Sequence, residues 1–303
     1  KKGDEVVLPS FTIVSCLAAV MRSGATPIFC DVDESSWNMS LENIKQCVTD
    51  KTKAILMVHT YGLPAEAFEI EEFCNKNNIL LIEDAAEAHG QIVGGRYCGS
   101  FGQISTFSFY ANKHITTGEG GMVLTDSSEI DELCRKIRNL DFSIPRFQHE
   151  NLFWNYRMGG MQAALGRSQI NNLDKTISLK KKQGSIYQNL LNENNHLVQL
   201  PLKEFKGSQN HYWVFGIVLK ENGIRDRLIE ILKEKGIETR PFFWPLHLQS
   251  ALTDEMKNIK YNLPVSQNLG DNGLYLPLGK HVSTQKQKFI SKTLIDTILE
   301  LKN

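Results

Sequence analysis

Two charged residues, Asp84 and Lys113, stand just after predicted strands in the first half of the chain. Asp84 follows the apolar run Leu80–Ile82. Lys113 comes four residues after the strand predicted at Ile104–Phe109 and precedes a glycine-rich turn. Open parallel sheets bind ligands beyond the carboxyl ends of their strands, so both positions are typical of a binding site. A lysine that is partly desolvated in such a pocket has a lowered pKa and attacks carbonyl groups.

Each of these residues also has a plainer interpretation. A loop lysine is most often a solvated surface residue, and an aspartate at a strand end often closes a turn or caps a helix. The pair is more specific. A lysine that forms a Schiff base and a carboxylate that keeps a pyridinium nitrogen protonated are the two protein groups that pyridoxal 5'-phosphate requires. Together, Lys113 and Asp84 therefore predict a pyridoxal-phosphate site.

The first 140 residues alternate apolar, β-branched runs with helical stretches, which predicts an α/β fold around a mostly parallel central sheet. Strands are predicted at Glu5–Leu8, Thr26–Asp31, Ala54–His59, Leu80–Glu83, Ile104–Phe109 and Gly121–Thr125. Helices are predicted at Ser15–Ser23, Leu41–Val48, Phe68–Asn77 and Glu129–Asn139, with Ser40 as the N-cap of the second.

A different pattern follows in the second half of the chain. One long helix is predicted from Gly160 to about Leu191 and is interpreted as a connector. A strand at Tyr212–Leu219 and a helix at Ile224–Lys235 follow it, and then the segment Arg240–His247, rich in proline and aromatic residues. We therefore expect a large domain over residues 1–190 and a smaller α+β domain over residues 191–303.

Composition excludes several classes of function. The 303 residues carry 34 basic and 34 acidic side chains, and this balance disfavours binding to nucleic acid or to anionic membrane surfaces. No apolar run approaches the roughly 18 residues of a membrane helix. The six cysteines are scattered and form no C-x-x-C pair, so we expect structural thiols, no metal site and a cytoplasmic location.

A series of motifs runs along essentially the whole chain in a familiar order and spacing. These are Gly3–Thr12, Gly24–Pro27, Thr52–Ile55, His59–Gly62, Ile82–Ala88, the loop around Lys113 and Asn155–Met158. With them the chain resembles the DegT/DnrJ/StrS family of sugar-nucleotide aminotransferases. Within that family, the Lys113 loop and Ile237–Pro241 are most similar to the branch that aminates 4-keto sugars.

The resemblance implies an aspartate aminotransferase-like, fold-type-I pyridoxal-phosphate enzyme. Its expected reaction moves an amino group from L-glutamate to the keto carbon of a nucleotide-linked 4-keto-6-deoxysugar, for cell-surface polysaccharide biosynthesis. It also implies a homodimer with active sites at the interface. Relatives that dehydrate their substrate have histidine where Lys113 stands, so the lysine favours amino transfer.

The family pattern also implies a role for individual residues. Lys113 would bind the cofactor covalently and then move protons, and Asp84 would keep the pyridine nitrogen protonated. Glu87 would contact the ring hydroxyl, where many relatives have glutamine. Ser108 would bind the cofactor phosphate, and Asn155 would reach that phosphate from the neighbouring subunit.

Two features depart from the family pattern. Ile13 replaces an aromatic residue that stacks on the pyridine ring, and it leaves an apolar lid without a π contact. The family also has, upstream of the Gly3–Thr12 match, a Ser-Gly-Thr turn that opens a phosphate-binding helix. The chain begins after that turn, so we expect a fragment that holds the cofactor poorly by itself.

The second half offers candidates for substrate contacts, and other functions stay open. Arg240 and His247, among aromatic residues, are the candidates for binding the sugar nucleotide, although the aromatic residues there also suit a core. Tyr212 and Trp213 are interpreted as core residues of a strand. The alternatives are a sugar 3-aminotransferase of the same family and an inactive homologue kept for association or regulation.

Overall fold

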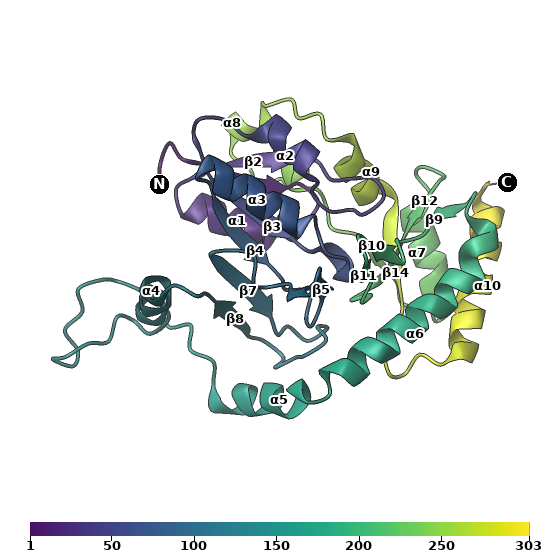
Figure 1. Ribbon diagram of the computed structural model, residues 1–303. Coiled ribbons are helices and arrows are strands. Elements are labelled where there is room, and N and C mark those ends of the chain that lie inside the picture. The colour runs from purple at the N-terminus through teal and green to yellow at the C-terminus, as the bar shows by residue number, and fades with distance from the viewer. Residues whose placement is uncertain (303) are drawn as a thin grey trace.

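A six-stranded sheet forms the centre of the first half of the protein (Figure 1). The structure is a computed structural model that describes residues 1–302, and for residue 255 it describes the backbone alone. The strand order is β2-β1-β3-β4-β7-β8. The bounds are β1 Glu5–Pro9, β2 Thr26–Cys30, β3 Thr52–Val58, β4 Leu80–Asp84, β7 Ile104–Ser108 and β8 Gly121–Leu124. All neighbours pair in parallel except β7 and β8, which are antiparallel. This confirms the predicted α/β fold with a mostly parallel sheet.

Helices cover both faces of this sheet, and their apolar sides explain how they pack. Helix α1 (Val14–Arg22) packs Cys16, Leu17 and Val20 on one face. On the other face lie α2 (Leu41–Cys47) and α3 (Ala67–Asn77). Ser40 caps α2 as predicted, because its side chain accepts a hydrogen bond from the Asn43 N–H. The central strands are buried on both sides, which is why they consist mostly of apolar residues.

A second, antiparallel sheet of four short strands lies in the other half of the chain, in the order β13-β14-β12-β9. The bounds are β9 Val198–Gln199, β12 Phe215–Leu219, β13 Arg240–Pro241 and β14 Gly273–Leu276. Its core includes residues of α6 (Leu173–Leu191), α7 (Arg225–Glu234) and α10 (Thr284–Lys302). Smaller elements are the pairs β5 Ile92–Val93 with β6 Arg96–Tyr97 and β10 Glu204–Phe205 with β11 Ser208–Gln209, and the helices α8 Asp254–Lys257 and α9 Pro264–Asn272.

The chain crosses back from the second sheet to the first. Leu246 and Leu252 pack in the same core as α1, and the Asp31 carboxylate after β2 accepts hydrogen bonds from the first turn of α9. The division of the chain at residue 190 stays a prediction, and it does not separate the apolar cores completely. Lys1 and Lys302, the first and last residues that the structure describes, are both exposed.

Two sequence predictions about single elements are wrong. The long helix from Gly160 is two helices, α5 (Gly160–Ile170) and α6, separated at Asn171 and Asn172. Asparagine has a low helix propensity, so two in succession favour a break at this point. The strand predicted from Tyr212 starts only at Phe215, because Tyr212 adopts a left-handed φ of 48°.

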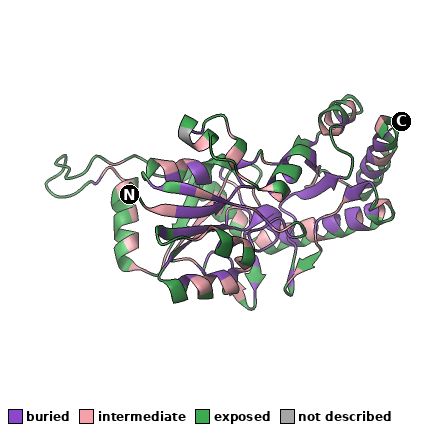
Figure 2. Ribbon diagram, turned by 90° about the horizontal axis from the view of Figure 1, so that it is seen from above, coloured by how far each residue is buried: buried purple, intermediate pink, exposed green. Residues whose placement is uncertain are grey.

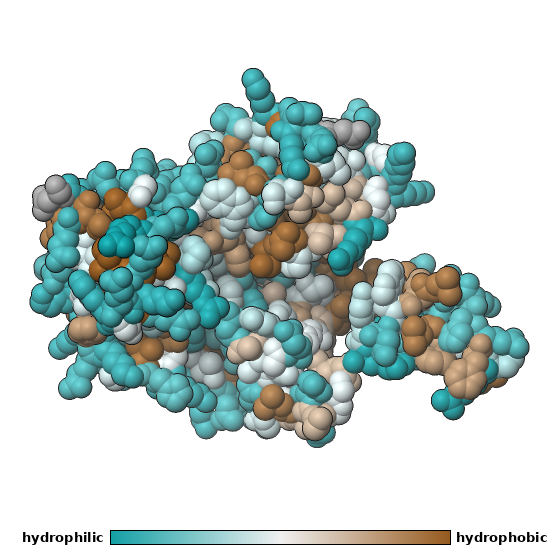
Figure 3. Space-filling model, turned by 180° about the vertical axis from the view of Figure 1, so that it is seen from behind, coloured by the Kyte–Doolittle hydropathy of each residue, from teal (hydrophilic) through white to brown (hydrophobic). Residues whose placement is uncertain are grey.

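The segment from α4 (Ser128–Arg138) through α5 projects from the rest of the protein (Figure 1). Within the described chain, neither helix has a buried residue, and the loop that follows α4 is exposed along most of its length (Figure 2). It nevertheless carries large apolar side chains, visible on the projecting lobe at the right of Figure 3. The most exposed are Ile144, Phe147, Leu152, Tyr156 and Met161. Among residues 1–302, no helix has both the length and the apolar composition needed to cross a lipid bilayer.

Candidate active site

The carboxyl ends of β4 and β7 bring the predicted site residues to one edge of the central sheet. Asp84 is the last residue of β4, and Ser108 is the last residue of β7. The two strands are parallel neighbours, with Asp84 in register with Thr106. The loop that carries Lys113 leaves the same end of β7, so the tertiary structure gathers the three residues at the edge where ligands of such sheets bind.

Glu83, the residue before Asp84, anchors this end of β4. Its buried carboxylate accepts hydrogen bonds from backbone N–H groups of residues 99, 101 and 102 and from the Ser105 hydroxyl. His59 Nε2 lies 2.8 Å from it, and His59 Nδ1 accepts a hydrogen bond from the Ala65 N–H, so Nε2 carries a proton and donates a hydrogen bond to the Glu83 carboxylate. Burial raises the pKa of Glu83, but His59 and these donors outweigh burial and hold the pKa at about 2. The charged Glu83 carboxylate, held by these donors, therefore fixes the end of β4 and the position of Asp84.

The Asp84 carboxylate accepts one hydrogen bond at each oxygen. The Ala86 N–H donates to Oδ1 at 3.0 Å, and the Cys16 thiol in α1 donates to Oδ2 at 3.2 Å. Burial and the charge of Asp84 raise the pKa of Cys16 well above its ordinary value, so the thiol keeps its proton and stays a donor. Asp84 and Cys16 face a cavity of about 330 Å³ between α1 and the sheet, which leaves the carboxylate accessible to a ligand.

The Lys113 amine is enclosed between a carboxylate and an aromatic ring. Its side chain is 9% exposed, and Nζ lies 3.5 Å from Glu87 Oε1 and 3.7 Å from the centre of the Trp213 ring. The other Glu87 oxygen accepts a 2.8 Å hydrogen bond from the Tyr61 N–H. The charges of Lys113 and Asp84 both act on the pKa of Glu87, so the three groups form one electrostatic cluster.

Glu87 makes a testable contribution to the pH dependence of stability. Burial raises its pKa from 4.5 to about 7, even though Lys113 lowers it. The unfolded chain therefore releases the Glu87 proton at lower pH than the folded protein does. As a result, Glu87 lowers the free energy of unfolding as the pH rises from 4.5 to about 7. We predict that Glu87→Gln flattens this part of the profile of Tm against pH. A variant with the same downward slope as the parent protein would contradict the assignment.

Trp213 is a site residue that sequence reasoning missed. The sequence pattern predicts a core residue, and Trp213 is indeed buried. Its ring also covers the Lys113 amine, and its Nε1 donates a 3.0 Å hydrogen bond to the Asn112 carbonyl. Backbone contacts of Trp213 with Tyr61 bring it there. Gly62 permits this approach, because a Cβ at that position would lie 2.7 Å from the Trp213 nitrogen.

Substitutions of Trp213 separate its two contacts. Trp213→Phe keeps an aromatic face for the amine but removes the hydrogen bond to the Lys113 loop. We expect it to lower kcat about two- to tenfold, since one hydrogen bond contributes about 1 kcal/mol. Trp213→Leu removes both contacts and should lower kcat further, by the additional cation–π contribution of about 1 kcal/mol. Steady-state kinetics, with Tm as the control for folding, measure both effects. Equal loss in the two variants would show that the aromatic face contributes nothing.

The structure does not bring every predicted site residue to Lys113. The Ser108 hydroxyl accepts a 3.2 Å hydrogen bond from the Tyr110 N–H at the start of the Lys113 loop. Ile13 is the N-cap of α1 and 42% exposed, so it is free to contact a ligand. Asn155 lies in the projecting segment, where its backbone pairs with that of Asn139 in an isolated antiparallel β-bridge. The roles of Ser108, Ile13 and Asn155 remain predictions.

Arg240 and His247 occupy different places. Arg240 lines a cavity of about 430 Å³ between the Lys113 loop and the second sheet, which also includes Trp213. His247 is not among the residues that line this cavity. Its Nδ1 lies 2.6 Å from the Ser10 hydroxyl, beyond the carboxyl end of β1. Only Arg240 of the pair therefore borders the space beside the Lys113 loop.

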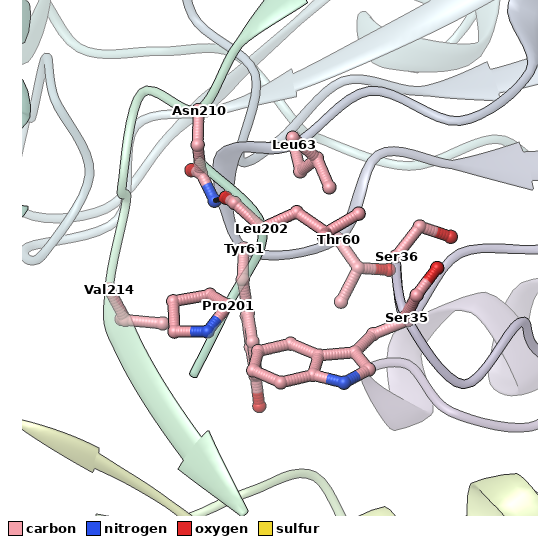
Figure 4. A pocket seen from close by; sticks show the side chains of 10 residues that line it. Ser35, Ser36, Thr60, Tyr61, Leu63, Pro201, Leu202, Asn210 and Val214 are labelled. Carbon is pink, nitrogen blue, oxygen red and sulfur yellow. Dashed lines mark hydrogen bonds between the residues drawn. The ribbon is translucent and has the colours of Figure 1, made fainter. Parts of the chain in front are cut away.

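A third hollow is too small for a substrate. Thr60, Tyr61, Pro201 and Asn210 are among the residues that line it (Figure 4), and its volume is about 10 Å³. That is the space of about one water molecule. Among the described residues, a further cavity of about 540 Å³ is lined by α3 alone and includes none of the predicted site residues. The cavities beside Asp84 and beside Arg240 are therefore the candidates for ligand binding.

A sequence model of the DegT/DnrJ/EryC1/StrS aminotransferase family matches residues 1–295. The chain belongs to this family. It is 39% identical to a GDP-perosamine synthase of Escherichia coli O157:H7, over 97% of this chain and 79% of that protein. It is also 33% identical to a UDP-N-acetyl-3-dehydro-alpha-D-glucosamine 3-aminotransferase of Acidithiobacillus ferrooxidans, over 91% and 73%. The crystal structure of the aminotransferase TlmJ from Streptoalloteichus hindustanus superposes with a TM-score of 0.92 at 27% identity, covering 100% of this chain and 81% of that one.

This aminotransferase depends on pyridoxal 5'-phosphate, and its donor set fits that cofactor. The buried amine of Lys113 is a primary amine of the kind that binds the cofactor aldehyde. The Asp84 carboxylate, at the neighbouring strand end, is an acceptor for a protonated ring nitrogen. Ser108 adds a hydroxyl at the end of β7. A primary amine, a carboxylate and a hydroxyl at one sheet edge match the aldehyde, ring nitrogen and phosphate of the cofactor.

Proposed function

We propose that this aminotransferase moves an amino group from L-glutamate to the keto carbon of a nucleotide-linked 4-keto-6-deoxysugar, in the synthesis of a cell-surface polysaccharide. The observation that carries the proposal is the enclosed Lys113 amine, which shares one electrostatic cluster with Asp84 and Glu87 at the carboxyl ends of β4 and β7. The 39% identity to a GDP-perosamine synthase supports the choice of a 4-keto sugar.

The bound cofactor supplies the electron sink of the reaction. Lys113 would bind it covalently and, once released, carry protons to and from the reacting carbon. Asp84, held by Cys16 and Ala86, would keep a proton on the ring nitrogen. Glu87 would contact the ring hydroxyl, because its carboxylate lies beside the Lys113 amine, which would bind the neighbouring aldehyde.

Other residues would hold the cofactor and the substrate in place. Ser108 would donate a hydrogen bond to the cofactor phosphate, and Ile13 would cover the ring with an apolar side chain. Arg240, which lines the cavity beside the Lys113 loop, would contact the substrate. His247 stays a weaker candidate for the same role, because it lies against Ser10 and not in that cavity.

The active assembly would be a homodimer in the cytoplasm. The projecting segment exposes large apolar side chains, and a second copy of the chain would remove them from water. Asn155 lies in this segment and would reach the cofactor phosphate of the partner. The six cysteines, all within the described residues, are free thiols, which suits a reducing compartment.

A sugar 3-aminotransferase is the second candidate, because a relative with that activity in its name is 33% identical to this chain. The two candidates share the cofactor chemistry and differ in the keto position. The protein, supplied with pyridoxal phosphate and L-glutamate, should be incubated with GDP-, UDP- and dTDP-linked 4-keto and 3-keto sugars. Mass spectrometry should show amination of a 4-keto sugar. Amination of a 3-keto sugar alone would establish the second candidate, and no amination of any sugar would contradict both.

A further inference from the structure

The cavity beside the Lys113 loop is lined by two cations, Lys180 and Arg240, and the fold does not explain why Lys180 is there. We call it the Lys180 cavity; its volume is about 430 Å³, and the polar and aromatic residues that line it are Tyr110, Asn112, Lys180, Trp213, Glu238, Arg240 and Tyr275. Lys180 comes from the middle of α6, and Arg240 comes from β13 of the second sheet. The two cations therefore approach one space from different elements.

Lys180 is a partly buried amine without a balancing charge. Its Nζ donates one hydrogen bond, 3.2 Å long, to the Trp213 carbonyl, and no carboxylate among the described residues lies within ion-pairing distance of it. Burial lowers the pKa of Lys180 to about 8. Holding an amine in such a place costs free energy unless an anion joins it. The missing partner can come from a ligand in the cavity.

Arg240 is at the more exposed side of the same cavity. It pairs with Glu238 at 3.2 Å, and both side chains are more than half exposed. Exposed ion pairs of this kind contribute about 0–1 kcal/mol, so an anionic ligand can replace Glu238 at little cost. The rings of Tyr110, Trp213 and Tyr275 line the remaining wall and offer flat surfaces for a sugar or a base.

We propose that Lys180 and Arg240 form a phosphate-binding subsite in the Lys180 cavity, which takes the diphosphate of a nucleotide-linked substrate. This inference rests on the proposed function, and it adds Lys180 as the inner cation. A diphosphate carries several anionic oxygens that bind two cations at once, with the Arg240 guanidinium as a planar donor and Lys180 as a point charge. The volume exceeds what the carboxylate of an amino acid alone would fill, which favours a diphosphate with its attached groups.

The test measures binding of GDP, UDP, dTDP and inorganic pyrophosphate to the holoenzyme by calorimetry. Lys180→Gln keeps a donor for the Trp213 carbonyl but removes the charge, and it should weaken binding of pyrophosphate and of the preferred nucleotide about tenfold or more. Lys180→Arg should retain most of the affinity. Lys182→Gln, on the exposed side of the same helix, is the matched control and should leave affinity unchanged.

The cofactor's spectral response to L-glutamate is recorded for the same variants, because the amino donor carries carboxylates but no phosphate. It should be unchanged in Lys180→Gln. Unchanged affinity for pyrophosphate and nucleotides in Lys180→Gln would overturn the inference, as would a selective loss of the glutamate response. Binding of no diphosphate by the parent protein would overturn it too. These outcomes are distinct from failure of the proposed function, which shows as no amination of any keto sugar by the parent protein.

Discussion

Replacing Lys113 with alanine is expected to abolish amino transfer, with kcat reduced about 10³-fold or more, because the variant loses both the nucleophile and the proton carrier. The visible absorption band of the lysine-bound cofactor should disappear with it. The structure predicts little change in folding, because Lys113 makes one 3.5 Å ion pair and one ring contact. Absorption spectra and kinetics of the purified variant measure both effects.

A matched control for this prediction is Lys76→Ala, which removes an exposed lysine that pairs with Glu72 on α3. It should keep the absorption band and full activity, since exposed ion pairs contribute little to stability. Borohydride reduction of the parent protein, followed by peptide mapping, should place the cofactor on the peptide that contains Lys113. A band that persists in Lys113→Ala, or a label on another lysine, would remove Lys113 from the proposed role.

Replacing Asp84 with asparagine is expected to lower kcat about 10²-fold or more while the cofactor still binds, because an amide cannot hold a proton on the ring nitrogen as a carboxylate does. The side chain keeps its size, so the bond from the Ala86 N–H at Oδ1 should survive. Single-turnover measurements with L-glutamate isolate the proton-transfer steps from sugar binding. Normal turnover in Asp84→Asn would show that this carboxylate does not act on the ring.

The hydrogen bond from the Cys16 thiol to Asp84 can be tested by comparing two variants of Cys16. Cys16→Ser keeps a donor for Oδ2, and Cys16→Ala removes it. Because the thiol stays protonated next to Asp84, the serine variant should behave like the parent protein and the alanine variant should be slower. The difference is expected to be small beside that of Asp84→Asn, since one neutral hydrogen bond contributes about 1 kcal/mol.

Most of the central sheet could be predicted from local sequence patterns. The runs that form β1 to β4 are short, apolar and separated by helices with recognisable ends, as Ser40 at the start of α2 shows. The break at Asn171 and Asn172 was missed, because the apolar spacing continues across it and periodicity alone does not detect a local turn. Tyr212 was placed in a strand, because its left-handed backbone follows from docking against the Tyr61–Gly62 turn, which no local pattern reports.

By itself, the sequence determined the family, the α/β fold and the two residues on which the proposed chemistry depends, Asp84 and Lys113. They stand beside strand ends and within motifs, so their signal is local in the chain. Only the tertiary structure placed Trp213 over the Lys113 amine, although 101 positions separate it from Asn112, and turned Lys180 toward the cavity of Arg240. Contacts of this kind depend on how the two sheets and α6 pack against one another. The types and spacing of side chains along a single element do not determine that packing.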